Sequence, residues 1–112
     1  MKHLMLALLL PAALFSAAPV DAGNAERGRE KSAICQACHG VDGNGIGMDM
    51  YPILAGQFPD YLAHAMRAYK TGEREDVVMR GFAAPLSEQD IKDLAAWYGS
   101  QKGPLADLSH FK

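Results

Sequence analysis

Apolar residues recur at helical spacing in the middle of the chain. Between Pro59 and Gly72 they stand at i, i+3, i+4 and i+7, and they are Leu62, Ala65, Met66 and Tyr69. That spacing predicts one helix with a single buried face. Pro59 suits a first helical position and Gly72 suits the residue after a last turn, so we expect the helix to lie between them.

A second amphipathic stretch lies near the end of the chain. Ser87 and Asp90 form an S-x-x-D pattern, which caps a helix N-terminus. One face of the expected helix carries Ile91, Leu94, Ala95 and Tyr98. Trp97 flanks this face and Gly99 closes the helix. The pattern predicts no particular structure for the tail, residues 105–112.

A shorter helix is expected at residues 25–33. Asn24 suits its N-cap, and Glu26 places a negative charge in the first turn, where the helix dipole favours it. Gly28 falls in the helix interior, where glycine costs about 1 kcal/mol relative to alanine. That cost suggests that another backbone or a large ring approaches closely at Gly28.

The segments between these helices lack strand alternation, so the expected fold class is all-α. Residues 40–47 hold four glycines, which favour a loop with positive φ angles or close contact with a flat ligand. Residues 51–57 are apolar and contain Pro52, which is typical of extended or turned backbone. Residues 71–78 are polar with mixed charges and are expected to form a surface loop.

The first 22 residues have the pattern of a secretory signal peptide. Lys2 precedes an apolar run, which small residues follow. The run is shorter than the roughly 20 residues of a membrane span, and Pro11 interrupts it. We expect cleavage after Ala18 or, preferably, after Ala22. Residues 1–22 are thus expected to be a signal peptide, and residues 23–112 one domain without a membrane span.

Composition limits the function classes. The chain has 112 residues, 49% apolar and 21% charged, which describes an ordinary single globular domain. The formal net charge of −2 and the lack of a basic stripe argue against a nucleic-acid partner. A mature chain of about 90 residues has a core of marginal stability. A bound cofactor would complete that core, and its loss is expected to unfold the protein.

Both cysteines belong to one motif, residues 35–39, with the sequence Cys-Gln-Ala-Cys-His. In an exported protein this C-x-x-C-H spacing is typical of covalent haem attachment. Cys35 and Cys38 can each add to one vinyl group, and His39 then binds the iron from one side. A thioredoxin-like dithiol would need alternating strands and helices, and zinc would need a fourth nearby ligand. The expected cofactor is therefore one covalent haem c.

A methionine is the expected second axial ligand, because thioether sulfur commonly completes a haem iron opposite histidine. Met48 and Met50 follow His39 by only nine and eleven residues, in a segment needed to wrap the histidine side. Met66 belongs to a buried helix stripe, where methionine usually fills the core. Met79 stands 40 residues beyond His39, which gives the chain room to pass round the ring. We therefore expect Met79 to be the ligand.

Four further residues are candidates for supporting the haem. Tyr51 and Arg74 could hydrogen-bond the haem propionates, because carboxylates favour arginine and hydroxyl donors. The alternative for both is a solvated loop position. Pro52 and Leu54 are expected to pack along the haem. His64 could ligate iron in principle, but a lone histidine on a helix is usually an ordinary surface or packing residue.

Several motifs in order resemble the class I c-type cytochromes, especially short bacterial electron carriers and single domains of tandem two-haem periplasmic cytochromes. The resemblance spans about residues 23–102. It rests on C-Q-A-C-H-G at 35–40, P-I-L-A-G-Q at 52–57, Y-L at 61–62, G-E-R at 72–74, and the stretches 79–83, 86–87, 90–91 and 94–97.

The resemblance implies a small cytochrome c fold, with three to four short helices wrapped around one covalent haem and the first and last helices crossing. It implies Met79 as the sixth ligand and a hydrogen bond between the Pro52 carbonyl and the His39 ring. Gly28 would pack against Trp97 where the helices cross. Trp97 stands where tyrosine is commoner in the family, which affects packing rather than chemistry.

If protein ligands fill both axial positions, no substrate reaches the iron. The sequence therefore predicts a periplasmic one-electron carrier and not an enzyme. It would act as a free carrier or as the haem subunit of a dehydrogenase complex, with other redox proteins as its partners. The alternative is a haem enzyme or gas sensor with an open or labile sixth position.

Overall fold

The computed structural model describes residues 8–14 and 22–106, and within them the chain is all-helical, as predicted. The α-helices are α1 (Ala25–Lys31), α2 (Gln36–His39), α3 (Pro59–Thr71), α4 (Val77–Ala83) and α5 (Glu88–Gly99). Two 3-10 turns cover Ser32–Ile34 and Pro104–Ala106. In these ranges no helix is long and apolar enough to cross a membrane. Most of the expected signal peptide and residues 107–112 lie outside the described residues.

The sequence patterns for α3 and α5 predicted both helices correctly. Pro59 begins α3, and Gly72 ends it in the left-handed conformation with φ of 81°. At the start of α5 the Ser87 hydroxyl accepts from the Asp90 N–H, and the Asp90 carboxylate accepts from the Ser87 N–H, each at 3.0 Å. These local contacts satisfy backbone donors that the helix cannot pair itself.

Helix α4 begins at Val77, so the last two residues of the surface loop expected at residues 71–78 are helical and that prediction was slightly too long. The Asp76 carboxylate caps the helix by accepting from the Met79 N–H at 2.8 Å. The sequence signal is weak because Val77, Val78 and Gly81 are poor helix formers. Packing against α3 stabilises the helix instead. With α4 and the four-residue α2, the fold exceeds the three to four helices expected.

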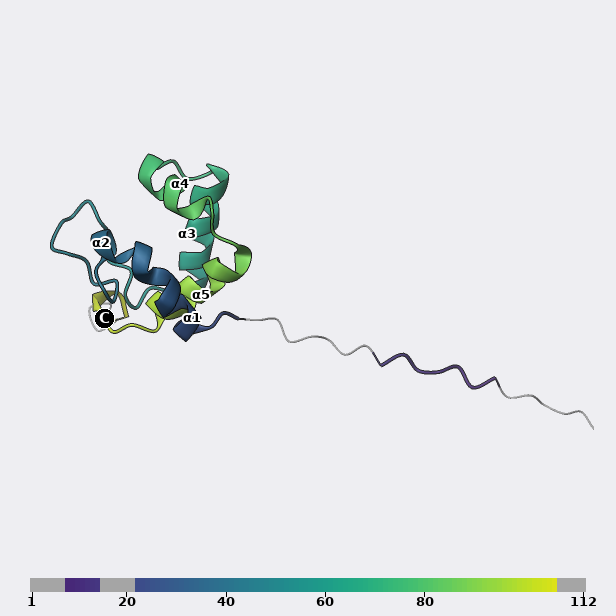
Figure 1. Cartoon of the computed structure of the whole chain (residues 1–112). Helices are drawn as coiled ribbons and strands as arrows, with labels where there is room; N and C mark the ends of the chain where they lie inside the picture. The colour runs from purple at the N-terminus through teal and green to yellow at the C-terminus, as the bar shows by residue number, and fades with distance from the viewer. Residues whose placement is uncertain (1–7, 15–21, 107–112) are drawn as a thin grey trace, which may run out of the picture.

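Helices α1 and α5 cross at Gly28, which confirms the expected close approach (Figure 1). A Cβ atom on Gly28 would lie 2.0 Å from the Asp93 carbonyl oxygen and 2.8 Å from the Trp97 Cβ atom. The buried Asp93 carboxylate joins the helices by accepting from the Asn24 N–H at 2.7 Å and from Arg27 Nε at 2.8 Å. Gln89 also donates to it, at 2.8 Å.

The hydrophobic core lies between α3 and α5. Its buried residues are Leu62, Ala63, Leu86, Ile91, Leu94, Ala95 and Tyr98. On the predicted face of α3 only Leu62 is fully buried, while Ala65, Met66 and Tyr69 are half-buried and line a hollow beside the core. The apolar face of α3 thus divides its contacts between the core and this hollow.

Candidate functional site

The two thiols and the imidazole of residues 35–39 lie on a single helical turn. The Cys35 carbonyl accepts from the His39 N–H at 3.0 Å, and the Gln36 carbonyl accepts from the Gly40 N–H at 2.9 Å. Residues three and four apart on such a turn share one face, so Cys35, Cys38 and His39 are presented together. Both cysteines are unpaired and half-buried.

The His39 ring has a fixed orientation. It is 6% exposed, and its Nδ1 atom lies 2.9 Å from the Pro52 carbonyl oxygen, the contact that the family resemblance implied. A carbonyl oxygen only accepts, so Nδ1 carries a proton, which leaves Nε2 as the atom that can bind a metal in the neutral ring. This is the arrangement that prepares a histidine to bind a metal through Nε2.

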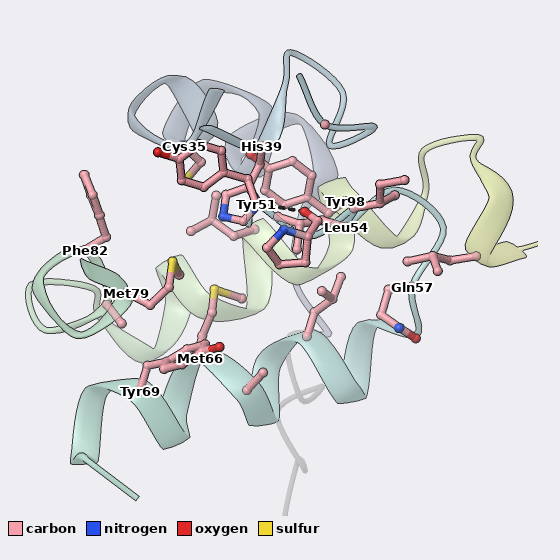
Figure 2. A pocket seen from close by; sticks show the side chains of 18 of the residues that line it. Cys35, His39, Tyr51, Leu54, Gln57, Met66, Tyr69, Met79, Phe82 and Tyr98 are labelled. Atoms are coloured by element: carbon pink, nitrogen blue, oxygen red, sulfur yellow. Dashed lines mark hydrogen bonds between the residues drawn. The ribbon is translucent and has the colours of Figure 1, made fainter. Parts of the chain in front are cut away.

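A hollow of about 630 Å³ opens beside this turn. Its walls are mostly apolar, and a second hollow of about 200 Å³ shares Cys35, His39, Pro52 and Met79 with it. Figure 2 shows Cys35, His39 and Tyr51 on one side and Met66, Tyr69 and Met79 on the other. The space between is contributed by segments distant in sequence.

The methionines reach this hollow from different elements. Met79, in the first turn of α4, lines both hollows, and its sulfur points into the space opposite His39 (Figure 2). Met66, from α3, packs against the core as its spacing predicted, and its sulfur also points into the hollow. Met48 lines the larger hollow and Met50 the smaller one, and the two residues are 49% and 69% exposed.

The predicted support residues all line the larger hollow: Tyr51, Pro52, Leu54 and Arg74. Arg74 is itself exposed at the rim. Its guanidinium lies 4.9 Å from the centre of the Tyr69 ring, and its Nη1 atom donates to the Tyr61 hydroxyl at 3.4 Å. His64 is exposed and is not among the lining residues.

Tyr98 is a lining residue that the sequence pattern assigned only to the core. Its ring is 3% exposed, but its hydroxyl is buried without a hydrogen-bond partner among the described residues. Burial, followed by the neighbouring Cys35, raises the pKa of Tyr98. Burial likewise raises the pKa of the Cys35 thiol. The sequence did contain a signal for this role, because Tyr98 carries a polar hydroxyl at the end of the otherwise apolar face of the last helix.

The residues present fit a covalently bound haem. Two thiols and an oriented imidazole on one turn supply attachment points and a nitrogen ligand. The hollow lies within the roughly 300–1,000 Å³ typical of cofactor sites, and its apolar walls suit a flat macrocycle. An all-helical chain with this motif facing such a hollow has the architecture of a c-type haem protein.

Comparison with known proteins agrees with this class. Residues 25–102 match the cytochrome c family, and the chain belongs to that family. It is 43% identical to cytochrome c4 of Pseudomonas aeruginosa over 102 residues, which cover 91% of this chain and 50% of the relative. It is 43% identical to cytochrome c-554(548) of Halomonas halodenitrificans over 84 residues, covering 72% of this chain and 100% of the relative.

A third relative is the thiosulfate dehydrogenase electron acceptor of Thiomonas intermedia, 40% identical over 98 residues, covering 88% of this chain and 44% of the relative. Among solved structures, reduced recombinant cytochrome c4 from Pseudomonas stutzeri superposes with a TM-score of 0.69 and 44% identity. That match covers 73% of this chain and 47% of the solved one. The chain spans about half the length of the cytochromes c4 it matches.

Proposed function

We propose that this chain binds one haem covalently through Cys35 and Cys38 and transfers single electrons between redox proteins. The observation that carries the proposal is the single turn that presents both thiols and an oriented His39 to an apolar hollow. Membership of the cytochrome c family supports the same cofactor. The chain holds one C-x-x-C-H motif, which supports a count of one haem.

In this proposal His39 Nε2 and the Met79 sulfur are the two axial ligands of the iron. The Pro52 carbonyl holds the His39 ring in position and keeps the proton on Nδ1. The Asp76 cap holds the first turn of α4, which carries Met79. When bound, the haem supplies a one-electron couple whose potential responds to its axial ligands, hydrogen bonds and burial.

The remaining lining residues would exclude water and orient the cofactor. Apolar side chains from α3, α4 and α5 line one part of the hollow, and residues 44–57 line much of the rest. Tyr51 and Arg74 are the candidates to hydrogen-bond the propionates, since Arg74 stands at the rim where a charged group can stay hydrated. With both axial positions filled by side chains of this chain, no substrate would reach the iron. The haem would then exchange electrons with partner proteins and catalyse no reaction of a bound substrate.

The relatives support electron transfer in more than one setting. One is named a cytochrome subunit of sulfide dehydrogenase, from Chlorobaculum tepidum, and the Thiomonas relative is named an electron acceptor. We infer that redox proteins are the partners here, either transiently or as members of a dehydrogenase complex. Co-purification from the periplasm would separate these two settings, because only a stable complex keeps its partner through gel filtration.

Export is part of the same proposal. Residues 1–22 would direct the chain to the periplasm and be removed there, and the haem would be attached in the same compartment. Mass spectrometry of the protein from a periplasmic extract should give a chain starting at Gly23, or at Pro19 if cleavage follows Ala18. A cytoplasmic chain that keeps all 22 residues would contradict this part of the proposal.

The decisive experiment is a set of absorption spectra of the haem-loaded protein. We expect low-spin haem c bands in both redox states, one haem per chain by mass, and no change when carbon monoxide is added to the reduced form. Carbon monoxide binding by the unmodified protein would instead favour an open sixth position and the enzyme or sensor alternative. Absence of haem from the isolated protein would overturn the proposal.

A further inference from the structure

The Tyr98 hydroxyl lies in the wall of the hollow without a hydrogen-bond partner among the described residues. A buried hydroxyl left unpaired is unfavourable, so native proteins rarely keep one without a reason. Trp97 Nε1 is also buried and unpaired, but Trp97 does not line the hollow. Tyr98 is therefore the residue whose unpaired group faces the cofactor site.

Its surroundings hold the Tyr98 ring in place. A Cβ atom on Gly43 would lie 2.6 Å from the Tyr98 Cδ1 atom, so the glycine loop packs directly on the ring. The Tyr98 carbonyl also accepts from the Gly56 N–H at 3.0 Å. The loop thus packs against one side of the ring and Gly56 holds the backbone, so the hydroxyl stays buried.

Cys35 and Ser32 are the polar side chains beside this hydroxyl. The Ser32 hydroxyl already donates to the Arg29 carbonyl at 2.7 Å, and it is the weak acceptor for Gln36 Nε2 at 3.4 Å. Within the described residues the Cys35 sulfur makes no comparable hydrogen bond, and Cys35 packs against the core cluster that contains Tyr98. Because burial raises the pKa of Tyr98, the hydroxyl stays protonated at neutral pH and can act as a donor.

We propose that, in the haem-loaded protein, the Tyr98 hydroxyl donates a hydrogen bond to the Cys35 sulfur and thereby raises the reduction potential. This rests on the proposed haem attachment at Cys35. A thioether sulfur keeps lone pairs and accepts hydrogen bonds weakly. The hydroxyl hydrogen, which stays on the tyrosine, places partial positive charge near the macrocycle. This charge stabilises the reduced state, which carries one more electron. Tyr98 is thus a positioning residue and does not bind the iron.

The test is the Tyr98→Phe variant, which keeps the ring and removes only the hydroxyl. Potentiometric titration should give a midpoint potential about 40 mV below that of the wild type, which is about a fivefold change in the one-electron equilibrium constant. The low-spin spectrum and the sulfur-to-iron band should persist, since both axial ligands stay in place. An unchanged potential would overturn the proposal.

Ser32→Ala is the matched control, because it removes the other polar neighbour of the hydroxyl. The reduction potential of Ser32→Ala should equal that of the wild type. An equal fall in both variants would mean that the hydroxyl acts through Ser32 and would overturn the assignment to Cys35.

A second measurement needs no variant. Deuterium exchange of the wild type should shift its carbon–sulfur vibration in the resonance Raman spectrum, and no shift would contradict the hydrogen bond. A wild type without a reversible haem couple would refute the proposed function itself, whereas a normal wild type with an unchanged variant refutes only this inference.

Discussion

At the scale of single residues, the two sides of the candidate site differ in how their positions arise. Cys35, Cys38 and His39 are brought together by one helical turn, so their sequence spacing was enough to predict their joint use. Met79 reaches the hollow because α4 packs on α3. The prediction for Met79 depended on its separation from His39 along the chain and on the family resemblance. Met66 packs against the core as predicted, and its sulfur also faces the hollow.

Replacing Met79 by alanine tests the proposed sixth ligand. Met79→Ala should abolish the weak long-wavelength band that arises from sulfur bound to ferric iron. It should also let carbon monoxide bind the reduced protein, because alanine leaves the sixth position open. Optical spectra of both redox states, with and without carbon monoxide, measure both effects.

Met66→Ala is the matched control for that experiment, since it removes a second sulfur that points into the hollow. The long-wavelength band should survive in Met66→Ala. If the band instead survives in Met79→Ala and disappears in Met66→Ala, the ligand is Met66 and the assignment of Met79 is wrong.

At the scale of elements, the crossing of α1 and α5 depends on the absence of a side chain at Gly28. A Cβ atom there would lie 2.0 Å from a backbone oxygen, which cannot rotate away as a side chain can. Gly28→Ala should therefore separate the two helices and lower the free energy of unfolding by about 2–3 kcal/mol. Chemical denaturation followed by far-UV circular dichroism measures this loss.

Gly81→Ala is the control for Gly28→Ala, because Gly81 lies in α4 and a Cβ atom there meets nothing within 4 Å. Alanine is the better helix former by about 1 kcal/mol, so this variant should be as stable as the wild type or more so. Equal destabilisation by both variants would show that the effect is not specific to the crossing.

The Asp93 carboxylate makes the same crossing sensitive to acid. The Arg27 guanidinium and two further donors lower its pKa from 3.8 to about 2. A carboxyl whose pKa is lower in the folded state stabilises the fold above about pH 4 and loses that contribution as the pH falls toward 2. The contribution is about 1–2 kcal/mol, discounted because Arg27 is half exposed.

Denaturation curves at about pH 6 and about pH 2.5 measure this dependence, and Asp93→Asn provides the comparison. The wild type should lose more stability between the two pH values than the variant does, because asparagine does not titrate. A variant with the same pH dependence as the wild type would contradict the role given to Asp93.

The helices also differ in how well local sequence predicted them. The caps and glycine stops of α3 and α5 are local signals, and both helices were predicted correctly. Helix α4 was missed because two β-branched residues and a glycine mask its periodicity, while the Asp76 cap alone is a weak signal. Its stability comes from packing on α3, which no window of sequence contains.

At the scale of the whole molecule, the chain needs its cofactor to complete the core. The hollow of about 630 Å³ is open and mostly apolar, so without haem its walls are exposed to water and the burial that stabilises a core is lost. A mature chain of about 90 residues has little stability to spare for that loss. The haem-free chain should therefore lack this fold.

Comparing the wild-type chain produced with and without haem tests this expectation. The loaded protein should melt cooperatively and the haem-free chain should show no sigmoidal transition by circular dichroism. A Cys38→Ala variant, which keeps one possible thioether at Cys35, should retain haem and a cooperative transition at lower temperature. A haem-free chain that melts as cooperatively as the loaded one would show that the side-chain core is sufficient.

Features that depend on neighbouring residues could be predicted from the sequence: the caps and ends of α3 and α5, the positive φ angles of the glycine loop, and the single turn that carries both thiols and His39. Three further features emerged from the packing of distant segments: which sulfurs share the hollow with His39, the helical state of α4, and the position of the Tyr98 hydroxyl beside Cys35. Helical turns and caps are set by contacts three or four residues apart, whereas the hollow is enclosed by segments far apart in the chain, whose packing no local pattern encodes.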